Sequence, residues 1–106
     1  MLDSCARILR YTAELDFEDF TQNDVVFDAV VRRLQVIGEA AARIPPEMRE
    51  RHPQIEWRKI VGLRNIMVHQ YASVDEEILW DVVRNSISDL QDKLHRMLES
   101  QGNEGG

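Results

Sequence analysis

The sequence predicts an all-α protein, an antiparallel bundle of four main helices with a short connector helix. Apolar residues recur every three or four positions along most of the 106-residue chain, which is the spacing of one helical face. No run alternates apolar and polar residues, and no Asn-Gly or Asp-Gly pair marks a hairpin turn. The connections between the predicted helices are short, as is typical of a bundle.

One apolar face defines the first predicted helix. It consists of Leu2, Ala6, Leu9, Ala13 and Phe17. We expect a break in the following stretch, DFEDFTQND, and then a second helix capped by Asn23 or Asp24. Pro45 and Pro46 end this helix, because proline lacks the N–H and clashes with the preceding turn. The second apolar stripe consists of Phe27, Val30, Val31, Leu34, Ile37, Ala41 and Ile44.

The second half of the chain predicts a connector and two further helices. The stretch EMRERHPQIE is expected to hold one helical turn. A third helix is expected from Trp57 to about His69, apolar on most sides and therefore covered by the others. Ser73 with Glu76 forms a capping box that starts the last helix, which ends near Ser100. The last apolar stripe consists of Ile78, Val82, Ile87, Leu90, Leu94 and Leu98.

Length and composition predict one domain in a reducing compartment. Residues 1–100 form the helical domain, and residues 101–106 form a flexible tail. No apolar run approaches the roughly 20 residues that span a bilayer, and the first residues lack the pattern of a signal peptide. The single cysteine, Cys5, excludes an internal disulfide and a Cys-based zinc cluster. We therefore expect a cytoplasmic protein without a membrane partner.

The charge is unevenly distributed. The net charge is −6, but residues 43–64 hold six bases and three acids, a local +3 that leaves −9 for the remainder. A basic segment of this kind suits a phosphate ligand, while the acidic remainder limits indiscriminate binding to nucleic acid. An ordinary solvated surface explains the charge equally well.

Four polar residues lie in the stretch GLRNIMVHQY: Arg64, Asn65, His69 and Tyr71. Each has a structural explanation, because buried polar groups need partners. Arg64 can pair with an acid of a neighbouring helix, and Asn65 can bond to His69 one turn later. His69 also suits a helix C-terminus, and Tyr71 suits a helix end with its hydroxyl in water.

The geometry of a regular helix separates Arg64 from His69. Five residues correspond to roughly 140° around the axis and ~7.5 Å of rise, so the two side chains diverge. Either the helix loosens near His69, or a second copy of the chain completes the site across a two-fold axis. Gly62 would then allow the close approach of another backbone.

Histidine and arginine together suit RNA cleavage without a metal. Histidine transfers protons near neutral pH, and arginine holds phosphate bidentately. A base takes the 2′-hydroxyl proton, arginine stabilises the charge that develops, and an acid protonates the leaving 5′-oxygen. The sequence offers no metal-ligand spacing and no Gly-rich phosphate loop, so we expect no metal and no cofactor.

The spacing Arg64, four residues, His69, one residue, Tyr71 resembles the R-x-x-x-x-H-x-Y motif of the HEPN superfamily. More narrowly, WRKIVGLRNIMVHQY resembles the HepT-like toxin family. The likeness extends to QVIGEAA at residues 35–41, to the IPPEMRERHPQIEW connector and to the last helix.

This resemblance implies a homodimeric, metal-independent endoribonuclease with a HEPN-like fold. It implies the toxin of a toxin–antitoxin pair with transfer RNA as a target class. Arg64 and His69 take the catalytic places, Asn65 the supporting polar place, and Tyr71 the tyrosine to which a nucleotidyltransferase antitoxin of the MNT type transfers AMP. Further RNA-backbone contacts are expected from Arg43, Arg58 and Lys59.

A second interpretation remains open. The same bundle can act as a non-catalytic, dimeric binding module that partners a nucleotidyltransferase, with the polar groups at the interface. Both interpretations predict dimers. Replacement of His69 by alanine separates them, because it abolishes RNA cleavage under the first and loosens the complex under the second.

Overall fold

The computed structural model describes residues 1–66 and 76–104, with side-chain environments for residues 1–66 and 76–100. Every regular element in these ranges is helical, which confirms the all-α prediction. The elements are α1 (Leu2–Thr12), α2 (Phe17–Gln22), α3 (Asp24–Ala42), α4 (Pro46–Arg51), α5 (Trp57–Gly62), the 3₁₀-helix η1 (Leu63–Asn65), α6 (Glu76–Asp81), the π-helical turn η2 (Val82–Ser86) and α7 (Ile87–Glu104).

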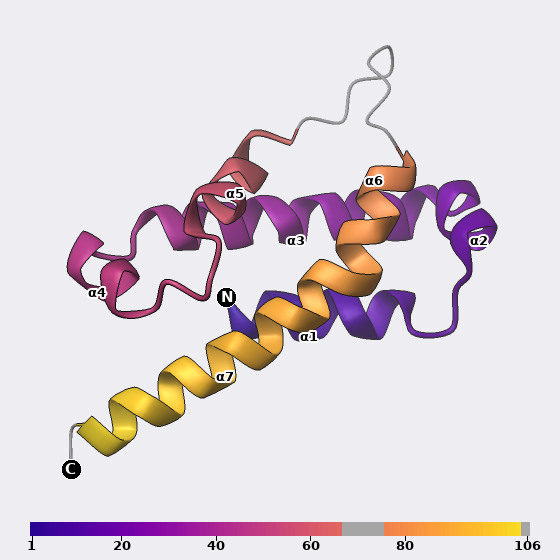
Figure 1. Cartoon of the computed structure of the whole chain (residues 1–106). Coiled ribbons are helices and arrows are strands. Elements are labelled where there is room, and N and C mark those ends of the chain that lie inside the picture. The colour runs from indigo at the N-terminus through magenta and orange to yellow at the C-terminus, as the bar shows by residue number, and fades with distance from the viewer. Residues whose placement is uncertain (67–75, 105–106) are drawn as a thin grey trace.

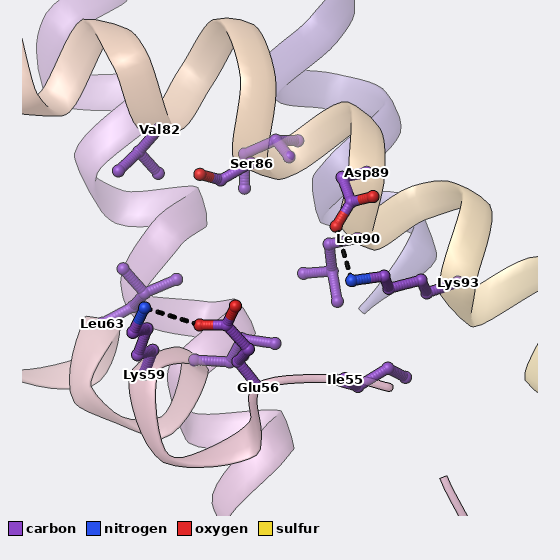
Figure 2. A pocket seen from close by; sticks show the side chains of 11 residues that line it. Ile55, Glu56, Lys59, Leu63, Val82, Ser86, Asp89, Leu90 and Lys93 are labelled. Atoms are coloured by element: carbon purple, nitrogen blue, oxygen red, sulfur yellow. Dashed lines mark ion pairs between the residues drawn. The ribbon is translucent and has the colours of Figure 1, made fainter. Parts of the chain in front are cut away.

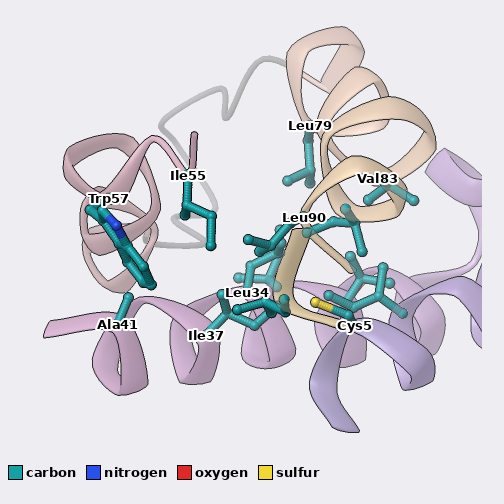
Figure 3. Close-up of a cluster of buried hydrophobic side chains, with 14 of the residues drawn as sticks. Cys5, Leu34, Ile37, Ala41, Ile55, Trp57, Leu79, Val83 and Leu90 are labelled. Carbon is teal, nitrogen blue, oxygen red and sulfur yellow. The ribbon is translucent and has the colours of Figure 1, made fainter. Parts of the chain in front are cut away.

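Helix α3 is the centre of the fold (Figure 1). It runs opposite to α1 and contacts α1, α2, α5 and η1, while α7 packs on α1. The core lies between these helices and contains the fully buried Leu34 and Ile37 of α3 and Cys5 of α1 (Figure 3). Leu90 joins it from α7, and Trp57 extends it at the start of α5. The packing therefore places α5 and η1 against the second half of α3.

The expected stripe of α3 is confirmed. Its five central residues are buried, and Phe27 and Ile44 pack against the core from its two ends. The Asn23 side chain accepts a hydrogen bond of 3.1 Å from the Val26 N–H, so Asn23 is the N-cap. After Pro45, the connector forms the single short helix α4, with Pro46 in its first turn, where a missing N–H costs nothing.

The expected break after the first helix is wrong, because it contains α2. The Asp16 carboxylate accepts from the Asp19 N–H at 2.8 Å, and the Asp19 carboxylate accepts from the Asp16 N–H at 3.3 Å. This reciprocal cap starts a helix from two acids. In this helix Phe20 is completely buried and packs against the rings of Phe27 and Trp80.

The buried face of α1 also differs from the expected one. Ala6 and Ala13 are exposed, and Phe17 belongs to α2. The face that enters the core consists of Ser4, Cys5, Ile8 and Thr12. The Thr12 hydroxyl donates a hydrogen bond to the Ile8 carbonyl oxygen at 2.9 Å. This bond allows a polar residue to occupy a buried position that the apolar pattern did not indicate.

The third helix is shorter than expected. Regular α-helix ends at Gly62, η1 tightens the chain to Asn65, and Ile66 takes the extended conformation φ −65°, ψ 121°. It also stays only half-buried at Ile60 and Leu63 in the single chain. The prediction of one covered helix reaching His69 is therefore wrong.

The last helix contains a π-helical turn that the periodicity did not reveal. Helices α6 and α7 continue through η2 (Figure 1), and α7 ends at Glu104 instead of near Ser100. Ile78 and Leu98 are 64% and 52% exposed. Ile87, Leu90 and Leu94 are buried as expected, and the rest of the buried stripe consists of Leu79, Val83 and Met97. Ser73, the expected cap, lies outside the described residues.

Candidate functional site

Arg64 lies on η1 with its side chain exposed to solvent. Among the described residues its guanidinium makes no hydrogen bond and no ion pair, so the expected structural pairing with an acid is absent from that part of the chain. Asn65 is also exposed, next to it. Both side chains are thus open to a ligand. His69 and Tyr71 lie outside the described residues.

Helix α3 holds the backbone that carries Arg64. The side chain of Gln35 donates from Nε2 to the carbonyl oxygen of Ile66. One turn later, Gly38 is buried against Arg64. A Cβ on Gly38 would lie 2.9 Å from Arg64 Cα and 3.0 Å from Arg64 Cβ, and real Cβ atoms essentially never come so close. The absence of a side chain at Gly38 therefore permits this contact.

Among the described residues no other backbone approaches Gly62 closely, and the expectation that Gly62 admits the backbone of a second copy stays a prediction. A Cβ on Gly62 would meet no other atom of the structure within 4 Å, apart from its chain neighbours and its own helix backbone. The close backbone approach occurs at Gly38 instead. Because the helix ends at Asn65, Arg64 and His69 do not lie on one regular helix, and the divergence expected from helical geometry does not apply to them. Of the two expected alternatives, the helix loosens before His69, and completion of the site by a second copy stays a prediction.

Trp57 fixes the start of α5. It is 8% exposed, and its indole N–H donates to the backbone carbonyl oxygen of His52 at 3.0 Å. His52 is itself only 6% exposed, although it lies in a polar connector where an exposed side chain would be expected from the sequence. The His52 carbonyl oxygen also accepts from the Ile55 N–H at 3.2 Å, so His52 closes the turn between α4 and α5.

The three candidate basic contacts differ in their surroundings. Arg43 is exposed at the C-terminal end of α3, and Arg58 is exposed on α5. Lys59 pairs with Glu56 at 2.7 Å. The hydrogen bond and the negative charge of Glu56 raise the pKa of Lys59, and the same contact lowers the pKa of Glu56. Lys59 is therefore less free than Arg58 to hold a phosphate.

An apolar groove of about 250 Å³ separates α5 and η1 from η2 and α7 (Figure 2). Ile60, Leu63, Val82 and Leu90 are among the residues that line it. The ion pairs Lys59–Glu56 and Lys93–Asp89 also lie there. Arg64 does not line this groove, so Lys59 and Arg64 do not share one pocket.

Sequence reasoning missed Gln35 and Gly38. Both lie in the QVIGEAA stretch, and Gly38 interrupts an apolar helix where glycine costs about 1 kcal/mol relative to alanine. That cost indicates a close approach. The partner of Gly38 lies 26 positions further along the chain, beyond the reach of any local pattern. In the described part of the chain, no three His, Cys, Asp or Glu residues converge for a metal ion.

The comparisons place the chain in a family of ribonucleases by its sequence. The family model described as ribonuclease HepT-like matches residues 1–97. The chain is 37% identical over 90 residues to "Probable ribonuclease HepT" of Thermococcus cleftensis, which covers 85% of this chain and 82% of that protein. It is 36% identical over 87 residues to "Putative RNase MJ1380" of Methanocaldococcus jannaschii, with 82% and 80% covered. No solved structure matches significantly.

Proposed function

Because the chain belongs to the ribonuclease HepT-like family, whose members' names support an RNA-cleaving activity, we propose that it is the toxin of a type II toxin–antitoxin pair. It cleaves RNA, with transfer RNA as the expected class, and does so without a metal ion. Arg64 and His69 are its catalytic residues, Asn65 supports them, and two copies of the chain form the working enzyme.

Each catalytic residue has a defined part in this proposal. A histidine removes the proton from a ribose 2′-hydroxyl, whose oxygen then attacks the adjacent phosphorus. Arg64 stabilises the negative charge that develops on the phosphoryl oxygens. A second proton donor, His69 of the other copy, protonates the 5′-oxygen as its bond to phosphorus breaks. The products are a 2′,3′-cyclic phosphate and a 5′-hydroxyl.

The single observation that carries the proposal is the state of Arg64. An exposed guanidinium without an acidic partner in the described chain, on a backbone held by α3, keeps its full charge available for phosphate. A structural arginine would instead be bound to an acid or to backbone carbonyl oxygens. Arg49 shows that alternative, because its guanidinium is bound to backbone carbonyls.

The test is cleavage of total cellular RNA in EDTA by unmodified protein, followed by analysis of the new RNA ends. Arg64→Ala should lower the rate about 100- to 1,000-fold, as expected for loss of one charge-stabilising group. Arg96→Ala is the matched control, because Arg96 is an exposed arginine on α7. Equal rates for the parent and Arg64→Ala would contradict the assignment of Arg64, whereas no cleavage by the unmodified parent would favour the non-catalytic binding module.

The control of activity rests on Tyr71. A nucleotidyltransferase antitoxin would transfer AMP to its hydroxyl and place a phosphate near Arg64, where it competes with the substrate phosphate. Incubation with the antitoxin and ATP should add the mass of one AMP to the parent and nothing to Tyr71→Phe. A dimer mass in light scattering is also expected, and a purely monomeric active enzyme would contradict the shared site.

A further inference from the structure

Both backbone polar groups of Ile66 are held in the folded chain. Its carbonyl oxygen accepts from Gln35 of α3, and its N–H donates to the Leu63 carbonyl at 3.1 Å. Ile66 is also the residue at which the chain leaves helical geometry. The end of η1 is thus held both by a local hydrogen bond and by a contact from a residue 31 positions earlier in the chain.

Gly38 provides the second contact from α3. It lies three residues after Gln35, so both belong to one face of α3. The face is closed at Gly38, because any Cβ there would overlap the backbone of Arg64. The contact at Gly38 therefore fixes the distance between α3 and η1, and the hydrogen bond from Gln35 fixes the position of η1 along α3.

We propose that Gln35 and Gly38 are positioning residues that hold the Arg64 guanidinium in its catalytic place. This inference rests on the proposed function of Arg64. The side chain of Arg64 has no hydrogen-bond partner among the described residues. The position of the guanidinium therefore depends on where the backbone places the Arg64 Cα. A three-residue 3₁₀-helix has poor hydrogen-bond geometry of its own, and contacts from α3 supply the missing rigidity.

Gln35→Met removes the donor while keeping the length of the side chain. It should lower kcat about 10- to 100-fold, because a small displacement of a catalytic group has effects of that size. KM should change much less than kcat. The substrate is a synthetic RNA that carries the main cleavage sequence found in total RNA. Gln22→Met is the matched control, since Gln22 is exposed and its amide donates to Glu18 of the same helix.

Gln35→Glu adds a second measurement, the pH dependence of the rate, which would not change if Gln35 were only a packing residue. At neutral pH its carboxylate cannot donate and faces the Ile66 carbonyl oxygen, so kcat should fall at least as far as in Gln35→Met. As the pH drops toward the ordinary glutamate pKa of about 4.3, the protonated side chain regains a donor. Its rate relative to the parent should therefore rise. A relative rate that stays constant with pH contradicts the proposed hydrogen bond.

Amide hydrogen exchange tests the positioning without RNA. In Gln35→Met the N–H groups of Leu63 and Ile66 should exchange faster than in the parent, while those of α1 and α7 should not change. Gly38→Ala should have the same local effect if it folds. Gly62→Ala is its control for exchange, because a Cβ there meets no further atom. Equal acceleration across all helices would indicate general destabilisation and would overturn the proposal.

The two proposals fail in different ways. If the unmodified parent cleaves no RNA, the proposed function is wrong, yet faster exchange at Ile66 in Gln35→Met would still support the hold of α3 on η1. If the parent cleaves RNA and Gln35→Met retains both its kcat and its slow exchange at Ile66, the positioning proposal is wrong and the proposed function stands.

Discussion

The guanidinium of Arg49 caps the end of α3 by binding the carbonyl oxygen of Ala42. Its second terminal nitrogen donates to that oxygen at 3.1 Å, and its Nε donates to the Ile44 carbonyl at 2.9 Å. The last carbonyls of a helix lack partners within the helix and carry partial negative charge. Arg49 therefore belongs to the scaffold, although the sequence counted it in the basic segment expected to bind phosphate.

Arg49→Ala should lower the free energy of unfolding by about 1–3 kcal/mol, since hydrogen bonds from a charged donor contribute in that range. Urea denaturation monitored by circular dichroism measures the change. The control is Arg51→Ala, because Arg51 is exposed on the same short helix. Equal stability of the two variants would show that the Arg49 contacts contribute nothing net.

Cys5 predicts how stability depends on alkaline pH. Burial raises the pKa of its thiol from the ordinary 9.0 to about 11. The unfolded chain therefore loses the thiol proton at lower pH than the folded chain. The thiol's contribution to stability is complete below pH 9 and is lost as the pH rises toward 11.

Between pH 8 and pH 10 this linkage should cost about 1 kcal/mol of unfolding free energy. Cys5→Ala should lack that part of the pH dependence, although its stability at pH 8 is lower because of the cavity in the core. Urea denaturation at both pH values measures the difference. Identical pH dependence in the parent and Cys5→Ala would contradict the raised pKa.

Arg58 and Lys59 are neighbours that should contribute differently to RNA binding. Arg58 is exposed and makes no ion pair in the described chain, whereas the Lys59 ammonium is paired with Glu56. If Arg58 contacts a phosphate, Arg58→Ala should reduce the slope of log affinity against log salt by about 1. Lys59→Ala should change it less. A larger change of the salt slope in Lys59→Ala than in Arg58→Ala would contradict the prediction that Arg58 contributes more to RNA binding.

Local signals account for the parts of the fold that the sequence predicts correctly. The α3 stripe is regular, Asn23 caps it, and two prolines follow it, so all three signals agree. Helix α2 was missed because its cap uses two aspartates where the usual capping box begins with serine or threonine and ends with glutamate or glutamine. In the last helix Ile87, Leu90 and Leu94 were predicted correctly, whereas the buried Leu79 and Val83 lie before or in the π-turn and were not.

For the candidate site, the sequence indicates which residues carry the chemistry but not which distant residues contact them. Arg64 stands out in the sequence as a polar residue in an apolar stretch, and the structure places it in solvent without a partner among the described residues. The contacts that hold it could not be inferred, because Gln35 and Gly38 act across two helices. These contacts lie where helical geometry ends, at Arg64 and Ile66, and a local sequence pattern carries no information about them.

The central claim is that the Arg64–His69 pair cleaves RNA, and one comparison tests it most directly. The rate at which 2′,3′-cyclic phosphate ends form in EDTA is measured for the parent, His69→Ala and His95→Ala, with intact masses confirming unmodified Tyr71. His95 is the control because it is exposed on α7. We expect loss of about 100- to 10,000-fold in His69→Ala, the range for general acid–base catalysis, and parental rates in His95→Ala. Parental rates of cyclic-phosphate formation in His69→Ala would contradict the account.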